Sequence, residues 1–382
     1  MGESRSYGVP LYSLSWVPKH VIESRQIETA GESSKADQSS PPLTEGLADG
    51  SYLVVAGGGG EGHSGIPNSV LLAHFDVASN SLSDQPVSRL GTGSELPYRM
   101  AVHPNGDGLI CAMPKSCRWF EWDSEIHQLG LKLSDRVLTQ LEDVGQQLAL
   151  AFNNDGTALA AGGEDGYLRV FKWPSMEIIL DESNAHSTVK DLHFSSDGKL
   201  LASLGSSGPC RVWDVSSSTV LATLSNENHE VFRYCRFSQI NDGTQVLYIF
   251  VMADKGGRIL TWNTQTWERM GSKHIIRDAI SALNVSADGK FLACGTTSGD
   301  IVIINSTNMK IQTMSKRAHL GIVTALAFSP NSRAVASVSM DSRVTVTIIE
   351  EKKNGGLSLW IAVFIILLAV VAYFLKVEGI GK

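Results

Sequence analysis

The sequence predicts an all-β protein, a seven-bladed WD-repeat β-propeller followed by a single C-terminal transmembrane helix. Three observations predict it. Similar strand–turn–strand units recur through residues 96–349, a Gly-rich segment interrupts an earlier unit, and an uncharged apolar segment lies near the C-terminus. The chain has 382 residues, 43% of them hydrophobic and 19% charged, so it can bury a sizeable core and is not a disordered chain.

The charge and the cysteines exclude several classes of function. A formal net charge of −7 argues against a nucleic-acid partner, because nucleic-acid binding needs a basic face that displaces counterions. The cysteines are odd in number and form no CxxC pair, so a zinc site or a disulfide framework is not expected. They are Cys111, Cys117, Cys210, Cys235 and Cys294.

The repeated unit has the length and the pattern of a propeller blade. An alternating apolar strand runs into an Asp-Gly or Asn-Gly turn, and a strand of small and branched residues follows. The third strand ends near Trp, as in the Trp213-Asp214 dipeptide, and His186 and His319 occupy the position of a structural histidine. The turn landmarks recur about every 42 to 46 residues, the period of a four-stranded blade. They are Asp155, Asp197, Asp242, Asp288 and Asn331.

Six such units account for residues 96–349, and a seventh must precede them. Residues 51–76 contain two strands, Tyr52–Ala56 and Val70–Phe75. We expect the strand Gly8–Val17 to complete the last blade, which would close the ring and hide its sheet edges. The resulting domains are an N-terminal strand segment (1–22), a polar loop expected to be disordered (23–49) and the cytosolic propeller (50–349).

The C-terminal apolar segment predicts a membrane anchor. Residues 357–375 carry no charge and would reach about 28 Å as a helix, close to the thickness of a bilayer core. Trp360 and Tyr373 lie near opposite ends, where an aromatic belt would place them. A linker (350–356) precedes the span and a short luminal tail (376–382) follows it. Because residues 1–20 lack the apolar core of a signal peptide, we expect residues 1–356 to remain in the cytosol.

One loop departs from the repeat. Residues 57–68, GGGGEGHSGIPN, interrupt the hairpin of the first blade. A phosphate-binding loop would need a following helix or a terminal GK[ST], and neither is present. A flexible hairpin tip remains an alternative. The more specific alternative is an ordered loop whose carbonyl oxygens bind a hard cation and whose apolar tip, Ile66-Pro67, faces a partner.

The Gly-rich loop, the WD repeats and the C-terminal span together resemble the Sec-twelve family, which includes the prolactin regulatory element-binding proteins of animals. The resemblance covers nearly the whole chain and is strongest to the plant branch, the phosphate transporter traffic facilitators. It implies residence in the endoplasmic reticulum membrane and a role in transport from there to the Golgi. For the plant branch it implies that phosphate transporter cargo is helped to leave the endoplasmic reticulum. The founding members are guanine-nucleotide exchange factors for the Sar GTPase, which starts COPII coat assembly.

The resemblance also implies roles for loop residues. Those that match the family's potassium-binding loop are Gly57, Gly58, Gly59, Gly60, Gly65 and Asn68. Ile66, Pro67 and Asn68 occupy the segment expected to contact the GTPase. Exchange would need no covalent chemistry, so no catalytic residue is assigned, and neither GxSxG nor HExxH occurs. Three functions stay open: a transport factor without exchange activity, an exchange factor, and a non-catalytic membrane-anchored scaffold.

Overall fold

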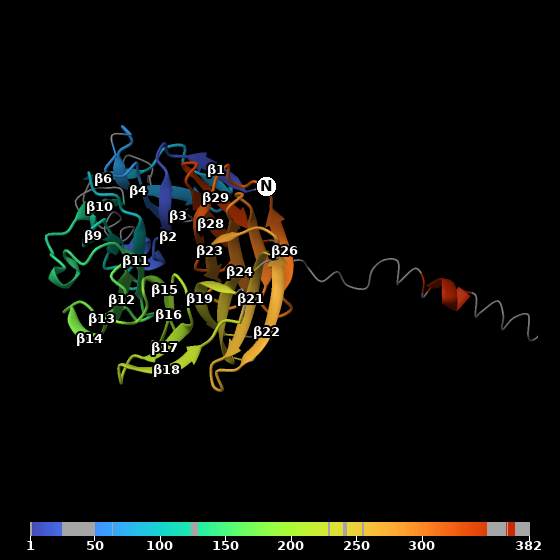
Figure 1. Cartoon of the computed structure of the whole chain (residues 1–382). Helices are drawn as coiled ribbons and strands as arrows, with labels where there is room; N and C mark the ends of the chain where they lie inside the picture. The colour runs from blue at the N-terminus through green and yellow to red at the C-terminus, as the bar shows by residue number, and fades with distance from the viewer. Residues whose placement is uncertain are drawn as a thin grey trace, which may run out of the picture. The chain divides into compact units, whose positions relative to one another are not determined.

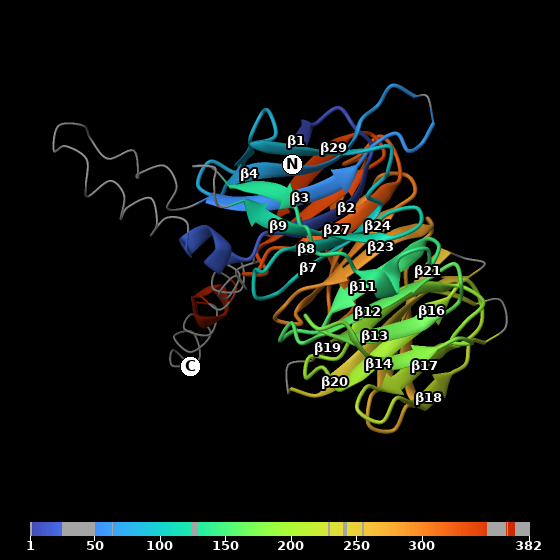
Figure 2. The same cartoon turned by 90° about the vertical axis from the view of Figure 1, so that its left-hand side faces the viewer.

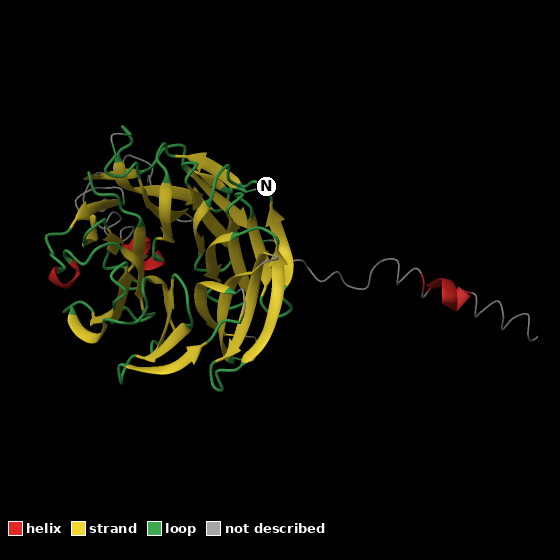
Figure 3. Ribbon diagram, viewed as in Figure 1, coloured by secondary structure: helices red, strands yellow, loops and turns green. Residues whose placement is uncertain are grey.

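The propeller consists of seven antiparallel sheets arranged as blades around a central axis (Figure 1). The computed structural model describes residues 2–24, 50–62, 64–123, 129–227, 230–239, 243–253, 256–349, 364 and 366–370. Strands make up nearly all of the regular secondary structure of the propeller, and the helical segments are short (Figure 3). The predicted seven-bladed all-β fold is therefore confirmed.

Each blade is read from its inner strand outward, first to seventh in chain order. The inner strands are β2 (Leu11–Trp16), β7 (Arg99–Val102), β11 (Gln147–Phe152), β15 (Val189–Phe194), β19 (Val231–Gln239), β23 (Ile280–Val285) and β27 (Val323–Phe328). The second strands are β3 (Gly50–Gly57), β8 (Leu109–Ala112), β12 (Ala158–Gly163), β16 (Leu200–Gly205), β20 (Gln245–Ala253), β24 (Phe291–Thr296) and β28 (Ala334–Ser339).

The outer half of each blade completes the sheet. The third strands are β4 (Asn68–Asp76), β9 (Cys117–Asp123), β13 (Leu168–Lys172), β17 (Cys210–Asp214), β21 (Gly256–Asn263), β25 (Ile301–Asn305) and β29 (Arg343–Ile348). The outermost strands are β5 (Ser81–Leu82) with β6 (Ser88–Gly93), β10 (Gly130–Leu133), β14 (Glu177–Glu182), β18 (Thr219–Leu224), β22 (Arg269–Ile276), β26 (Lys310–Ser315) and β1 (Glu3–Ser6). A short 3-10 helix, η2 (Thr139–Leu141), lies between the second and third blades.

The hydrophobic core lies between neighbouring blades. Leu53 and Leu71 of the first blade pack with Val344 and Val346 of the seventh, and similar clusters join the next blades in turn. Each sheet packs on a neighbour at both of its faces, so the apolar side chains of both faces are removed from water. All five cysteines are buried and unpaired within these layers.

The Asp-Gly turns predicted at Asp155, Asp197 and Asp288 are confirmed, whereas Asp242 lies outside the described residues. Gly156, Gly198 and Gly289 have φ of 75°, 70° and 70°, the left-handed region that these hairpins require. In each turn the preceding aspartate accepts a backbone N–H two residues further on, as Asp197 does from Lys199 at 3.2 Å. The turns therefore owe their geometry to local residues.

The N-terminal segment closes the ring differently from the prediction. The four residues of β1 pair with β29, from Glu3 opposite Val346 to Ser6 opposite Arg343, and so complete the seventh blade. Leu11–Trp16, which we expected to complete that blade, instead pairs with β3 as the inner strand of the first blade. The placement of Gly8–Val17 in the last blade was therefore wrong.

Burial explains the difference. β2 places Leu11, Leu14 and Trp16 in the core between the first and seventh blades, as an inner strand must. The strand β1 reads ESRS and is only partly buried, as suits an outermost strand. The polar sequence ESRS of residues 3–6 could have indicated an outermost strand. The prediction instead followed the neighbouring apolar strand, whose pattern is stronger.

The structural histidine of the fourth blade is confirmed. His186 Nε2 lies 2.8 Å from Ser203 Oγ, and the buried Trp213 donates its indole N–H to the same hydroxyl at 2.8 Å. Burial lowers the pKa of His186 to about 4, helped by the nearby Arg211 cation. Because the imidazole of His186 is neutral at pH 7, its Nε2 can accept a hydrogen bond from the Ser203 hydroxyl. The buried polar groups of His186, Ser203 and Trp213 therefore all have hydrogen-bond partners.

The C-terminal part forms a separate unit, Ile349–Lys382. Within the part of the chain that the structure describes, no helix is both long and apolar enough to cross a membrane. Of the predicted span, residue 364 and residues 366–370 are described, and they are helical and exposed. The linker 350–356, the tail 376–382 and residues 25–49 of the predicted polar loop lie outside the described residues.

Ser203→Ala should lower the free energy of unfolding by about 2 kcal/mol, because it leaves the buried Trp213 N–H and His186 without their partner. Urea unfolding followed by tryptophan fluorescence measures the change. The control Ser217→Ala removes an exposed hydroxyl from a turn of the same blade and should change stability by less than about 0.5 kcal/mol. Equal effects of the two variants would contradict the role given to Ser203.

Candidate functional site

The Gly-rich loop is an insertion in a turn that is short in other blades. It joins β3 to β4 through residues 58–67, whereas the matching turn in the fourth blade needs only residues 206–209. The same backbone hydrogen bond begins the turn in both blades. In the first blade Gly58 N–H donates to Pro10 O at 2.9 Å, and in the fourth blade Ser206 N–H donates to Thr188 O at 3.2 Å. In Figure 2 the loop that follows β3 projects from the body of the propeller. The repeat thus fixes both ends of the insertion.

Asn68 holds the loop from inside. Its side chain is buried, with 3% of its surface exposed, although it stands at the start of β4. Its Oδ1 accepts the Gly60 N–H at 2.9 Å, and its Nδ2 donates to Gly60 O at 3.2 Å and to Gly93 O at 3.0 Å. One amide therefore ties the loop to itself and to β6, which restrains residues that the ladder cannot reach.

The glycines at the loop's base are required by close packing. A Cβ on Gly58, whose φ is 149°, would overlap Asn68 Oδ1 and approach Asn68 Cα to 2.5 Å. A Cβ on Gly59 would overlap Ser64 Oγ. Gly60 and Gly65 have φ of 78° and 69°, so they permit left-handed backbone in otherwise open space. The loop is therefore a compact folded element, and its close packing requires glycine at Gly58 and Gly59 because a larger residue would overlap its neighbours.

The tip presents apolar and uncharged groups to solvent. Ile66 is 37% exposed, and Pro67 beside it is exposed as well. Among the described residues of the loop, Glu61 is the only ionisable side chain, and it is exposed. His63 lies outside the described residues. Such a loop can bind and position a partner, but its described residues offer no buried acid or base for proton transfer.

The donors beside Asn68 suit a monovalent cation in their chemistry. Gly60 O, Gly93 O and Asn68 Oδ1 are neutral oxygens, the donor class that replaces the hydration shell of potassium. In the described part of the chain, no three His, Cys, Asp or Glu side chains gather as a metal site. The amide of Asn68 already bonds both carbonyls, so the order of the loop does not by itself require a cation.

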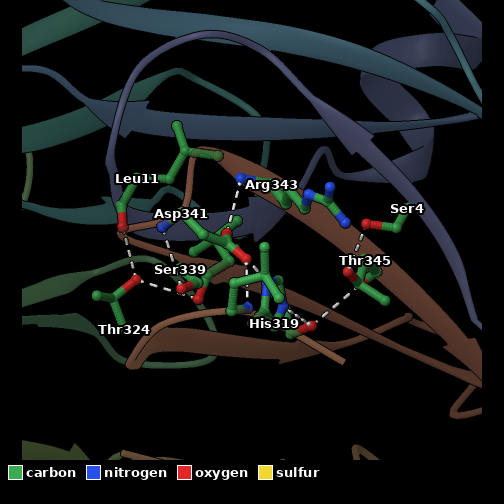
Figure 4. Close-up of polar contacts among 11 residues, drawn as sticks. Ser4, Leu11, His319, Thr324, Ser339, Asp341, Arg343 and Thr345 are labelled. Carbon is green, nitrogen blue, oxygen red and sulfur yellow. Dashed lines mark hydrogen bonds and ion pairs between the residues drawn. The ribbon is translucent and has the colours of Figure 1, made fainter. Parts of the chain in front are cut away.

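The seam between the seventh and first blades supports the loop from the other side (Figure 4). Thr324 Oγ1 donates to Leu11 O at 2.6 Å, and Leu11 is the register partner of Gly57. Nearby, His319 Nε2 lies 2.8 Å from Ser337 Oγ, and Asp341 lies 3.3 Å from His319 Nδ1. Burial lowers the pKa of His319, against the opposing effect of the Asp341 carboxylate. The seam is a rigid, hydrogen-bonded base for the loop.

Comparisons with known proteins match both the repeats and the whole chain. The WD domain, G-beta repeat, matches residues 143–172 and 310–346, and the anaphase-promoting complex subunit 4 WD40 domain matches residues 170–264. SEC12-like protein 2 of Arabidopsis thaliana is 51% identical over 361 residues, which cover 93% of this chain and 90% of that protein. The chain belongs to the Sec-twelve (SEC12) family.

Other relatives extend the family beyond plants. SEC12-like protein 1 of Arabidopsis thaliana is 33% identical, over 72% of this chain and 69% of that protein. A rat relative named guanine nucleotide-exchange factor SEC12 is 24% identical, over 79% of this chain and 87% of that protein. The family resemblance drawn from the WD repeats and the Gly-rich loop is thereby confirmed.

The structure brings the predicted site residues of this SEC12-family chain into two groups. Gly57, Gly58, Gly59, Gly60 and Asn68 lie together at the base, while Gly65, Ile66 and Pro67 are exposed; Pro67 and Ile66 lie directly against Gly58 and Gly59. Asn68, expected to touch the GTPase, faces the loop interior instead of solvent. Sequence reasoning missed Gly93, Leu11 and Thr324, because their roles depend on strand pairing that no local motif records.

Asn68→Ala should loosen the loop without unfolding the propeller, because Gly60 N–H and two carbonyl groups lose their partner. Hydrogen exchange of the amides in residues 58–67 should quicken about tenfold, and the melting temperature should change little. The control Asn154→Ala removes an exposed amide that donates to Ser196 O at 2.9 Å on another loop. Global unfolding of Asn68→Ala, or unchanged exchange, would contradict this role.

Proposed function

We propose that this protein is an endoplasmic reticulum membrane factor in transport to the Golgi, and that its Gly-rich loop engages a Sar-type GTPase. The observation that carries the proposal is the ordered insertion, held by Asn68, in a SEC12-family propeller. It places an apolar tip on a rigid base, which favours a specific protein contact over a flexible hairpin end.

Exchange activity would follow from binding alone. A loop that prefers the nucleotide-free GTPase lowers the barrier to GDP release by its differential affinity for the two states. Ile66 and Pro67 would make the contact, and Asn68 would act as a positioning residue. Relatives from rat and mouse are named guanine nucleotide-exchange factors, which supports this assignment.

Potassium enters the proposal as a further restraint on the loop. Gly60 O and Gly93 O are the groups that would hold it, in exchange for the Asn68 N–H bonds that they accept here, and Asn68 Oδ1, Gly57, Gly58, Gly59 and Gly65 would shape the backbone around them. When bound, the ion would supply a positive charge that neutral oxygens attract. The chain's own contribution is to hold these oxygens together through the Asn68 side chain.

A second candidate is a transport factor that promotes the exit of phosphate transporters without catalysing exchange. One observation favours it: the relatives at 51% and 33% identity are named SEC12-like proteins, whereas the relatives from rat and mouse named as exchange factors are 24% identical. A scaffold without either activity is the third reading. An exchange assay separates the exchange factor from the other two candidates.

In that assay, the full chain in detergent is added to a Sar-type GTPase loaded with fluorescent GDP. Wild type and Asn154→Ala should accelerate GDP release equally, whereas Asn68→Ala should lose about tenfold of the acceleration because its tip is no longer held. Replacing potassium by sodium should reduce the wild-type rate and leave the Asn68→Ala rate unchanged.

Each other outcome selects an alternative. Equal rates in both salts would exclude a potassium requirement and leave the loop proposal intact. Binding of the GTPase without accelerated release would favour the transport factor. Neither binding nor acceleration would exclude the GTPase as partner, and capture of phosphate transporters by the full chain would then decide between transport factor and scaffold.

The membrane anchor is proposed from residues 357–375. Within that span, the described helical residues expose apolar side chains, which suit lipid better than water. They are Phe364, Ile366, Leu367, Leu368 and Val370.

Deleting residues 357–382 should release the protein from membranes as a folded propeller, because β29 already pairs with β1 in the unit Met1–Ile348. Sedimentation after a high-salt wash, with the full chain as control, measures the release. Persistence of the truncated chain in the membrane pellet would show that another segment holds it there.

A further inference from the structure

The seventh blade exposes apolar side chains beside the Gly-rich loop. Leu320 is 78% exposed, Met340 is 47% exposed and Ile322 is also exposed. Leu320 and Ile322 precede β27, and Met340 follows β28, so all three lie on the turns at one end of the blade. An apolar group of this kind on a rigid surface needs a physical explanation.

The third, fourth and sixth blades carry polar residues at the position of Met340, whereas the second blade carries Met113 there, which is buried. The residue that follows the second strand is Met340 in the seventh blade, but it is Glu164 in the third, Ser206 in the fourth and Thr297 in the sixth. The residue after the structural histidine is Leu320 in the seventh blade and Ser187 in the fourth. Ser187 and Ser206 lie 3.4 Å apart through their hydroxyl oxygens. The turn therefore folds with polar residues, and the apolar pair is not required for its geometry.

The apolar side chains are held outward by the seam. The backbone N–H of Leu320 donates to Asp341 Oδ2 at 2.8 Å, and the neighbouring His319 is fixed by Ser337 and Asp341 (Figure 4). Asp341 also accepts the Arg343 N–H at 3.0 Å. With the backbone fixed on both sides, Leu320 cannot turn into the core without breaking these bonds.

The same seam joins this group to the Gly-rich loop. Thr324, two residues beyond Ile322, bonds Leu11 O at 2.6 Å, and Leu11 pairs with Gly57 at the base of the loop. The two departures from the ordinary turn, an insertion in the first blade and an apolar substitution in the seventh, therefore lie on adjacent blades at the same face. We call Ile66, Pro67, Leu320, Ile322 and Met340 the seam surface.

We infer that the seam surface is one docking surface, and that the GTPase engaged by the Gly-rich loop also packs on the seventh blade. This inference rests on the proposed function. The exposed Lys316 and Arg317 precede Leu320 on the same turn, although the chain carries a net charge of −7. The matching partner surface is therefore an apolar patch bordered by acidic side chains. Seventh-blade contacts would supply affinity and orientation, while the loop tip acts at the nucleotide.

The test replaces Leu320 and Met340 by the polar residues that the fourth blade carries at these positions. Leu320→Ser/Met340→Ser copies Ser187 and Ser206 of the fourth blade, so the turn should fold and the melting temperature should stay unchanged. The full chain in detergent is titrated with the nucleotide-free GTPase. The double variant should bind about tenfold more weakly or worse, because two buried apolar anchors are lost. The control Ile178→Ser removes an apolar residue that is 54% exposed on β14 and should bind as wild type does.

The outcomes separate this inference from the proposed function. If wild type binds, Asn68→Ala weakens binding and the double variant does not, the inference fails and the loop assignment stands. If wild type does not bind, both fail. Hydrogen exchange of residues 316–323 should slow when the GTPase is added. Slowing only in phosphatidylserine nanodiscs, with no effect of the GTPase, would overturn the inference in favour of a lipid contact.

Discussion

The architecture depends on hydrogen bonds that the inner strands make from one blade to the next. Seven inner strands expose their edges to the central axis, and unpaired edge groups are costly there. Side chains satisfy them in turn: Tyr234 bonds Ser281 O, Ser281 bonds Val323 O at 2.7 Å, and Thr324 bonds Leu11 O at 2.6 Å. The last of these bonds crosses the seam where the two ends of the propeller chain meet, so closure uses the same kind of bond as the junctions of the fifth blade with the sixth and of the sixth with the seventh.

This constraint explains where the distinctive surface lies. Leu11 accepts the bond that closes the ring and pairs with Gly57, from which the Gly-rich loop starts. The loop is thus attached to the junction whose integrity depends on β1 and β2, not to an independent hairpin. Asn68 then fixes the inserted residues against Gly60 and Gly93. The hydrogen bonds that close the ring thus restrain the base of the loop, and Asn68 restrains the exposed residues that follow.

Features that recur in several blades could be predicted from the sequence, whereas the strand pairing that closes the ring could not. The Asp-Gly turns, His186, Trp213 and the number of blades followed from a pattern repeated several times along the chain. The pairing of β1 with β29 occurs once and joins residues more than 330 positions apart, so periodicity carried no information about it. Composition alone could have placed ESRS at an outer edge and LYSLSW inside. In the loop, the glycines and Asn68 were recognised, but the burial of Asn68 and its bond to Gly93 follow only from the register of β4 with β6.

The strand that borders the seam surface also sets where the chain leaves the propeller. β29 begins at Arg343, next to the turn that carries Met340, and ends at Ile348. Its length of about 17 Å places these two points at opposite ends of the blade. Ile348 therefore lies at the end of the seventh blade away from the turn that carries Met340. Within the propeller, the end of the last strand and the apolar turns of the seventh blade thus belong to opposite faces of the ring.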